Sequence, residues 1–178
     1  MKGSLAKWRV RAGYPVVLLY FWLAHPKLEW LVTGAIAGIA GLAIRGLAAG
    51  HLRKHEGLAT SGPYAWTRNP LYFGSALLAA GLAIAAGSWL AAVVVAAYFL
   101  AFYPATLRSE ESELAREYGD TFREYAARVP LFWPRPPRSG VAGQKFSWVL
   151  YRRNREYNAA LGMAIVVALL AAKMIWLG

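Results

Sequence analysis

The chain has 178 residues, of which 58% are hydrophobic and 16% charged, and it carries a formal net charge of +11. Soluble domains average near 45–50% apolar and about 25% charged residues. This composition excludes a disordered chain, and the basic residues form no dense block of the kind that binds nucleic acid. The absence of cysteine excludes disulfides, thiolate zinc sites and a cysteine nucleophile. We therefore expect an integral membrane protein.

Charged residues divide the chain into apolar stretches of about the length that crosses a bilayer. Residues 69–107 hold no charge over 39 positions, about twice the roughly 20 that one span needs. Gly87-Ser88 interrupts this run near its middle, so we predict a hairpin of two helices. With the other apolar runs, the prediction is an all-α, polytopic chain forming a single domain (1–178), with about five transmembrane helices at 12–26, 30–50, 71–86, 89–107 and 158–178.

The distribution of Lys and Arg predicts the orientation. With the N-terminus inside, 18 of the 20 fall on the cytoplasmic side, within 2–11, 45–68 and 108–155, which is the asymmetry that the positive-inside rule describes. We expect an uncleaved first span and a cytoplasmic site built from the polar segments 46–70 and 108–157. Few charges lie within the spans, which argues against a transport path. Three scattered histidines make no metal site.

The first polar segment contains the stretch LATSGPYAWTRNPLYFGS, residues 58–75. Gly62-Pro63 and Asn69-Pro70 each predict a turn, with a short loop or one helical turn between them, and Pro70 suits the first position of the next helix. Its aromatic residues alone are typical of membrane-interface anchors. Anchoring does not explain an arginine, Arg68, among two turn prolines, so the stretch favours a site for a polar ligand with an aromatic base.

The second segment, residues 107–130, has the periodicity of an amphipathic helix. Gly119 is expected to interrupt that helix, with a new helix starting directly after it. The apolar positions fall on one helical face and are Leu107, Leu114, Tyr118, Phe122, Tyr125 and Val129.

Acidic residues are concentrated in this helix. Six of the nine acids of the chain lie between 108 and 128, against four arginines. We expect Glu113, Glu117 and Glu124 to be solvated and paired along the helix surface. Glu110 and Glu111 differ, because adjacent carboxylates at the inner end of a span are costly unless a positive group meets them.

GPYAWTRNPLYFGS, followed by a hydrophobic hairpin and then EESELAREYGDTFREYAARVP, resembles the isoprenylcysteine carboxyl methyltransferase family and the related phospholipid methyltransferases. The resemblance covers about residues 45–134, with both motifs in order. It implies an integral membrane methyltransferase that uses S-adenosylmethionine.

The resemblance also implies a cofactor pocket. Asn69 stands where many family members have histidine, so no histidine acts at that position. The strip before the first motif reads EGLA instead of a histidine followed by apolar residues. The implied cofactor-binding residues are Glu56, Gly57, Leu58, Ala59, Tyr64, Asn69, Pro70, Leu71, Tyr72 and Glu110.

The acceptor decides which further residues the reaction needs. A carboxylate is already ionised at neutral pH and requires only orientation, which Arg108 or Arg68 can provide through a bidentate pair. An amine requires a base to take its proton, and Glu111 is the candidate. Arg108, Glu111 and Arg68 are therefore the candidate catalytic residues, and no metal is expected.

The favoured reading is methyl transfer to a lipid or lipidated acceptor, as carboxylate O-methylation of the isoprenylcysteine type. The alternatives are a phospholipid amine N-methyltransferase, a membrane NADPH-dependent reductase of the sterol type, and a non-enzymatic membrane protein. Leu71 and Ser75 stand where the reductases carry Asn and Glu, which counts against that alternative. We expect a monomer in the bilayer with a lipid or prenylated partner and no nucleic acid; the acceptor, the oligomeric state and a lid role for 131–157 are left open.

Overall fold

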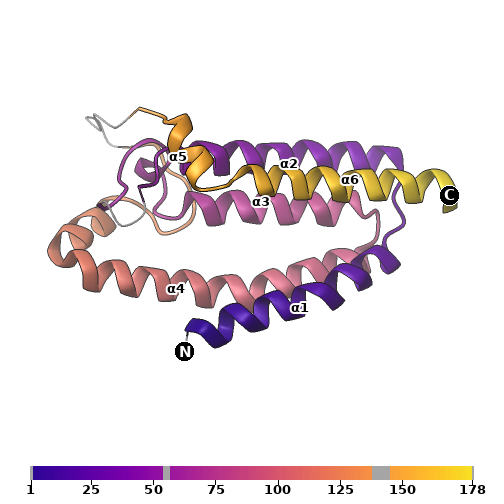
Figure 1. Cartoon of the computed structure of the whole chain (residues 1–178), viewed down its shortest axis with the longest axis horizontal. Coiled ribbons are helices and arrows are strands. Elements are labelled where there is room, and N and C mark those ends of the chain that lie inside the picture. Colours follow the sequence, from indigo (N-terminus) through magenta and orange to yellow (C-terminus); the bar gives the residue numbers. More distant parts are fainter. Residues whose placement is uncertain (1, 54–56, 138–144, 178) are drawn as a thin grey trace. The chain divides into compact units, whose positions relative to one another are not determined.

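The computed structural model describes residues 2–53, 57–137 and 145–177. Neither a strand nor a β-bridge occurs within these ranges, which confirms the all-α prediction (Figure 1). The helices are α1 (Lys2–Leu23), α2 (Leu28–Ala49), the short 3₁₀ helix η1 (Gly62–Ala65), α3 (Pro70–Ala85), α4 (Trp89–Arg128), α5 (Trp148–Arg153) and α6 (Tyr157–Leu177).

The long helices coincide with the predicted spans. By length and composition, α2, α4 and α6 can each cross a membrane, whereas the apolar segments Val10–Leu23 and Pro70–Ala85 are shorter. These helices identify a membrane protein. The count of five spans and their direction across the bilayer stay predictions.

Proline and glycine place the helix boundaries as the sequence predicts. Pro70 opens α3, where its missing N–H has no helical partner to lose. Gly87 has a φ of 59° between α3 and α4, a conformation that glycine adopts without strain. α4 joins the predicted span 89–107 and the amphipathic helix predicted after it into one element that ends at Arg128, with a break in its backbone at Gly119 (φ 51°, ψ −122°). The break confirms the predicted interruption.

The chain divides into two compact units, and the division falls within four of the helices. Unit 1 comprises 1–40, 76–105 and 161–178, and unit 2 comprises 41–75 and 106–160. The assignment of a single domain stays a prediction.

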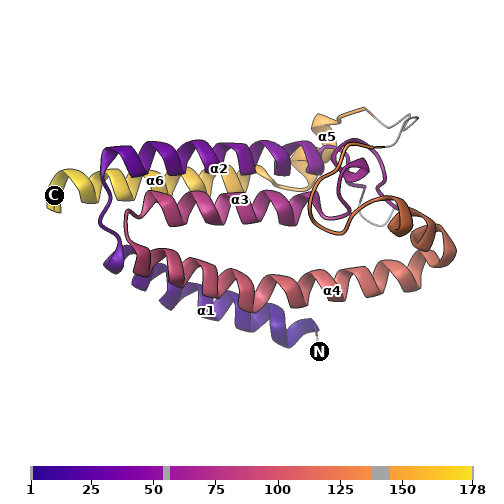
Figure 2. The same cartoon turned by 180° about the vertical axis from the view of Figure 1, so that it is seen from behind.

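Small residues let the helices of unit 1 pack closely. The unit 1 parts of α2, α3 and α6 run side by side, and α1 lies along the first part of α4 (Figures 1 and 2). A Cβ on Gly81 would lie 2.6 Å from the carbonyl oxygen of Gly34, so the α2–α3 contact requires glycine. The end of α1 is held from α6, because Lys173 Nζ donates to the carbonyls of Phe21 and Ala24 at 2.6 and 2.7 Å. Unit 1 is thus a helical bundle, and both sequence motifs lie mostly in unit 2.

Candidate functional site

Residues 130–135 hold the first motif in place. The Arg68 N–H donates to Pro130 O at 2.9 Å, and the Arg135 N–H donates to Trp66 O at 3.0 Å. The Thr67 hydroxyl adds a bond to Phe132 O at 3.0 Å. Since segment 130–135 directly follows α4, these bonds fasten the first motif to the end of the second.

Tyr125 provides a further link from the second half of α4. Its hydroxyl donates to the backbone carbonyl of Tyr64 in η1 at 2.7 Å, and both rings are buried. Burial raises the pKa of the Tyr125 hydroxyl, and it raises the pKa of Tyr64, to which nearby Tyr125, Glu156 and Glu110 also contribute. Both hydroxyls therefore stay protonated at neutral pH, so this donor is retained.

The adjacent carboxylates of Glu110 and Glu111 are expected to need a positive group nearby, and Arg68 provides it for Glu111. Its Oε2 lies 3.2 Å from Arg68 Nη1, and the side chains are 20% and 14% exposed. The Asn69 amide donates to Glu111 Oε1 at 3.3 Å and to Leu131 O at 3.0 Å. The Arg68 guanidinium also lies over the Phe122 ring, 5.8 Å from its centroid. Arg68, Asn69 and Glu111 thus form one polar cluster between the two motifs.

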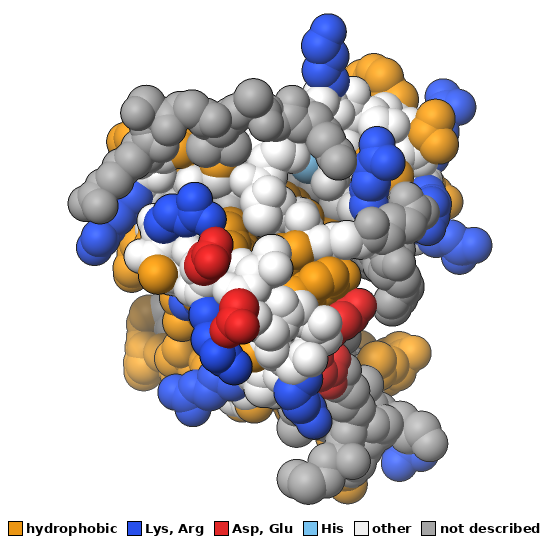
Figure 3. Space-filling view, turned by 90° about the vertical axis from the view of Figure 1, so that its left-hand side faces the viewer, with side chains coloured by type: hydrophobic (Ala, Val, Ile, Leu, Met, Phe, Trp, Pro, Cys, Tyr) orange, Lys and Arg blue, Asp and Glu red, His pale blue; other side chains and the backbone are white. Residues whose placement is uncertain are grey.

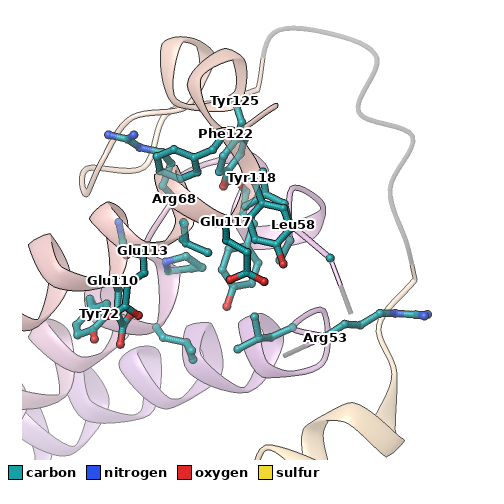
Figure 4. Close-up of a pocket in the computed structure, with 18 residues that line it drawn as sticks. Arg53, Leu58, Arg68, Tyr72, Glu110, Glu113, Glu117, Tyr118, Phe122 and Tyr125 are labelled. Carbon is teal, nitrogen blue, oxygen red and sulfur yellow. Dashed lines mark hydrogen bonds between the residues drawn. The ribbon is translucent and has the colours of Figure 1, made fainter. Parts of the chain in front are cut away.

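A pocket of about 320 Å³ opens between the two motif segments of unit 2 (Figure 4). It brings together most of the residues that the resemblance implies, from three stretches of chain. The implied residues that line it are Gly57, Leu58, Ala59, Tyr64, Asn69, Pro70, Leu71, Tyr72 and Glu110, and the candidate catalytic residue Arg68 lines it as well. Their role in binding stays a proposal, but their juxtaposition is a property of the fold.

One face of α4 makes the acidic wall of this pocket. Glu110, Glu113 and Glu117 line it together (Figure 4), because residues three and four apart share a helix face. The sequence predicts that Glu113 and Glu117 are solvated. Their spacing from Glu110 places the three on one helix face, but only the facing segment shows that this face lines the pocket. The other lining residues absent from the sequence prediction are Leu52, Arg53, Leu114, Tyr118, Phe122 and Tyr125.

Two of the candidate residues that the structure describes are not in the pocket lining. Arg108 is exposed, and two residues of helix turn it about 200° from Glu110. Glu111 is engaged in the cluster with Arg68 and Asn69. Glu56 lies outside the residues that the structure describes.

A second ion pair joins α2, α3 and the turn between α5 and α6 beside the pocket. Arg45 on α2 donates through Nε and Nη2 to both oxygens of Glu156, at 3.0 and 2.9 Å. Through Nη1 it reaches Ser75 Oγ and the carbonyl of Leu71 on α3. The preceding residue, Arg155, adopts a left-handed φ of 54°, a conformation that costs a non-glycine residue free energy. The pair therefore holds Leu71, a pocket residue, through its backbone.

We predict that Glu156→Gln lowers the free energy of unfolding in detergent by about 2–3 kcal/mol. The substitution leaves the Arg45 guanidinium, 21% exposed in the pair, without its counter-charge, and breaking a fully buried pair costs about 3–5 kcal/mol. The matched control is Asp120→Asn, because the Asp120–Arg123 pair is 88% and 75% exposed and such pairs contribute little. Chemical unfolding curves check this, and an equal effect of both substitutions would contradict it.

Residues 9–121 match the phospholipid methyltransferase family. Two similar proteins are the cobalt-zinc-cadmium resistance protein CzcN of Cupriavidus metallidurans (37% identical; 65% of this chain and 54% of the relative) and the nickel-cobalt-cadmium resistance protein NccN of Alcaligenes xylosoxydans xylosoxydans (30%; 90% and 79%). A third is the human protein-S-isoprenylcysteine O-methyltransferase (31%; 64% and 45%).

The chain spans about half the length of CzcN and of the human relative. No solved structure matches it. The family match includes the first motif and the glutamates of α4 that line the pocket. Since this match covers more than half of the chain, the protein belongs to the phospholipid methyltransferase family.

Proposed function

We propose that this protein is a membrane methyltransferase that uses S-adenosylmethionine to methylate a lipid or lipidated acceptor. The observation that carries the proposal is the pocket where the two motifs meet, with three glutamates on one wall and aromatic side chains around it. Its volume, about 320 Å³, lies within the range of roughly 300–1,000 Å³ for small-molecule sites.

The residues present fit this cofactor. It carries two positive groups, a sulfonium and an ammonium, which the carboxylates of Glu110, Glu113 and Glu117 can meet. Aromatic faces such as Tyr118 stabilise cations and bases by about 0.5–2 kcal/mol each. Within the described part of the chain, the Arg68 Nε is buried and has no partner, and such a donor suits the carboxylate of a methyl acceptor bound beside the cofactor.

We further propose that the acceptor is a carboxylate of the isoprenylcysteine type. When bound, S-adenosylmethionine supplies an electrophilic methyl group, and a carboxylate accepts it without losing a proton. An amine acceptor would need a base. Glu111, the candidate base, is already paired with Arg68, accepts a hydrogen bond from Asn69 and does not line the pocket. The human relative is named as a protein-S-isoprenylcysteine O-methyltransferase, and an oxygen acceptor supports this proposal over an amine. CzcN and NccN are named for metal resistance, and within the described residues no group of His, Asp and Glu could hold a metal ion.

The main contribution of the protein is then orientation. Holding donor and acceptor in line supplies up to about 7–11 kcal/mol in such reactions. We propose that Arg68 orients the acceptor carboxylate, because it lines the pocket, whereas Arg108 is exposed on α4.

We propose a cytoplasmic pocket. The part of the chain that forms it contains most of the Lys and Arg, and the face in Figure 3 shows these side chains around a few acidic ones. Basic residues near a membrane surface each contribute about 1 kcal/mol of attraction to anionic lipids. The N-terminus would lie on the same side.

We predict that purified protein binds S-adenosylhomocysteine with micromolar affinity, and that Glu110→Ala weakens this binding at least tenfold. Glu117→Gln should weaken S-adenosylmethionine more than S-adenosylhomocysteine, since only the former carries the sulfonium charge. Glu124→Gln is the matched control, because Glu124 is exposed on α4 and outside the pocket lining. Calorimetric titration in detergent measures each affinity. A folded protein that binds neither compound would overturn the proposed cofactor.

We predict that Arg68→Lys lowers kcat/KM for a carboxylate acceptor at least tenfold and changes the affinity for S-adenosylhomocysteine less than threefold. Lysine keeps the charge but loses the planar, bidentate geometry of arginine. Arg108→Ala should change kcat/KM less than threefold. A methyl-transfer assay with N-acetyl-S-farnesylcysteine makes the measurement. A large loss in Arg108→Ala with no loss in Arg68→Lys would instead assign acceptor orientation to Arg108.

A further inference from the structure

The turn between α5 and α6, residues 154–156, contacts two segments of unit 2 that line the cofactor pocket. The turn lies beside the end of α2 (Figures 1 and 2). Leu52, which follows α2, lines the pocket, and so does Leu71 in the first turn of α3. No described residue of α5 or of this turn lines it. The turn is therefore placed to act on the pocket walls without touching a ligand bound between them.

Asn154 holds the chain where it leaves α2. Its Nδ2 donates to Ala49 O at 2.9 Å and to Leu52 O at 3.0 Å, so both protons of the amide are used. The last carbonyls of a helix have no partner within the helix, and this side chain supplies one. The backbone adds a further bond, because the Ser147 N–H donates to Gly50 O at 2.9 Å. The path of the chain from α2 into the pocket wall thus depends on the α5 segment.

Glu156 acts on the first turn of α3 through Arg45. Both carboxylate oxygens of Glu156 accept from Arg45, and the Glu156 side chain is 11% exposed. The remaining nitrogen of Arg45, Nη1, donates to Leu71 O at 3.3 Å and to the Ser75 hydroxyl oxygen. A two-point contact with a carboxylate fixes the plane of a guanidinium. Glu156 therefore sets the direction in which Arg45 donates to Leu71.

The backbone between these two side chains is strained. Arg155 has a left-handed φ of 54°, which costs a non-glycine residue free energy and persists only where the surroundings hold it. Its two neighbours are the residues bonded to α2, Asn154 at the end of the helix and Glu156 at Arg45. The strained turn is thus the conformation in which both neighbours reach their partners.

The Arg45–Glu156 pair also acts electrostatically on a pocket side chain. Burial raises the pKa of the Tyr64 hydroxyl, Glu156 adds to this rise, and Arg45 opposes it. Tyr64 is buried and lines the cofactor pocket. A change in the pair therefore alters the charge environment of the pocket as well as the position of its wall.

We propose that Asn154 and Glu156 are positioning residues for the cofactor pocket, Asn154 at the exit of α2 and Glu156, through Arg45, at the first turn of α3. The inference rests on the proposed function. Because one short turn holds both segments, it fixes the spacing of two pocket walls before the ligand arrives, which lowers the ordering cost of binding. Cofactor affinity then depends on side chains that do not touch the cofactor.

The test measures S-adenosylhomocysteine affinity by calorimetry in detergent, next to chemical unfolding of the same samples. Asn154→Asp keeps the size of the side chain and removes both donors, and Glu156→Gln removes the charge that orients Arg45. We expect each substitution to weaken binding at least fivefold. Wild-type affinity in both variants would overturn the proposal.

Lys173→Met is the matched control, because Lys173 donates to carbonyl groups at the end of α1 within unit 1 and does not line the pocket. It should lower the stability of the protein and leave S-adenosylhomocysteine affinity within twofold. A loss of affinity in Lys173→Met equal to that in Asn154→Asp would assign the effect to general destabilisation and overturn positioning.

A charge exchange separates the ion pair from the contact with Leu71. Arg45→Glu combined with Glu156→Arg restores opposite charges, but a glutamate at position 45 cannot donate to Leu71 O. We expect the double variant to recover stability relative to Arg45→Glu alone and to bind S-adenosylhomocysteine at least fivefold more weakly than the wild type. Recovery of stability and affinity together would overturn positioning through Arg45. Asn154→Asp carries the test where the exchanged pair does not fold.

Hydrogen exchange without ligand distinguishes failure of this inference from failure of the proposed function. We expect amide exchange to rise at least fivefold within 49–53 in Asn154→Asp and within 69–76 in Glu156→Gln, and less than twofold at both segments in Lys173→Met. These local changes in a folded protein that binds no S-adenosylhomocysteine would overturn the proposed cofactor while supporting the positioning of the pocket walls. Unchanged exchange at both segments would overturn the positioning itself.

Discussion

The pairing of residues 130–135 with residues 66–69 is the constraint on which the rest of the site depends. The two motifs are separated by a long uncharged hairpin, and local sequence cannot bring them together. Backbone bonds from Arg68 to Pro130 and from Arg135 to Trp66, with side-chain bonds from Thr67 and Asn69, join them directly. These bonds satisfy polar backbone groups between two turn prolines and hold the loop against the segment that follows α4. The preceding face of α4 lines the pocket.

Charged side chains are distributed unevenly between the two sides of the first motif. Glu111 pairs with Arg68 and accepts a hydrogen bond from Asn69, so its negative charge is compensated within the protein. Glu110, Glu113 and Glu117 occupy the neighbouring helix face and concentrate negative charge at one pocket, in a chain whose net charge is +11. A pocket of that sign attracts a cationic ligand. On the other side of the motif, a second cavity between α2, α3 and the motif has an almost entirely apolar lining, so one segment separates a charged cavity from an apolar one.

Features set by local chemistry could be predicted from the sequence. The helix start at Pro70, the break at Gly119 and the helical hairpin at Gly87 follow from backbone preferences of proline and glycine. The pocket membership of Leu58, Tyr64 and Tyr72 came from the family motif, not from periodicity. The roles of Glu113 and Glu117 could not be predicted, because exposed and pocket-lining glutamates have the same helical spacing until the facing segment is known. The Arg45–Glu156 pair joins residues 111 positions apart, and no local pattern predicts it.

The central claim is that both motifs contribute to one binding site for S-adenosylmethionine. Direct ultraviolet cross-linking of methyl-radiolabelled S-adenosylmethionine to the protein in membranes, followed by peptide mapping, tests it without an acceptor. The account predicts label on peptides from both 57–72 and 110–125, displaced by excess S-adenosylhomocysteine. Displaceable label confined to peptides outside these two segments, or no displaceable label on folded protein, would contradict it.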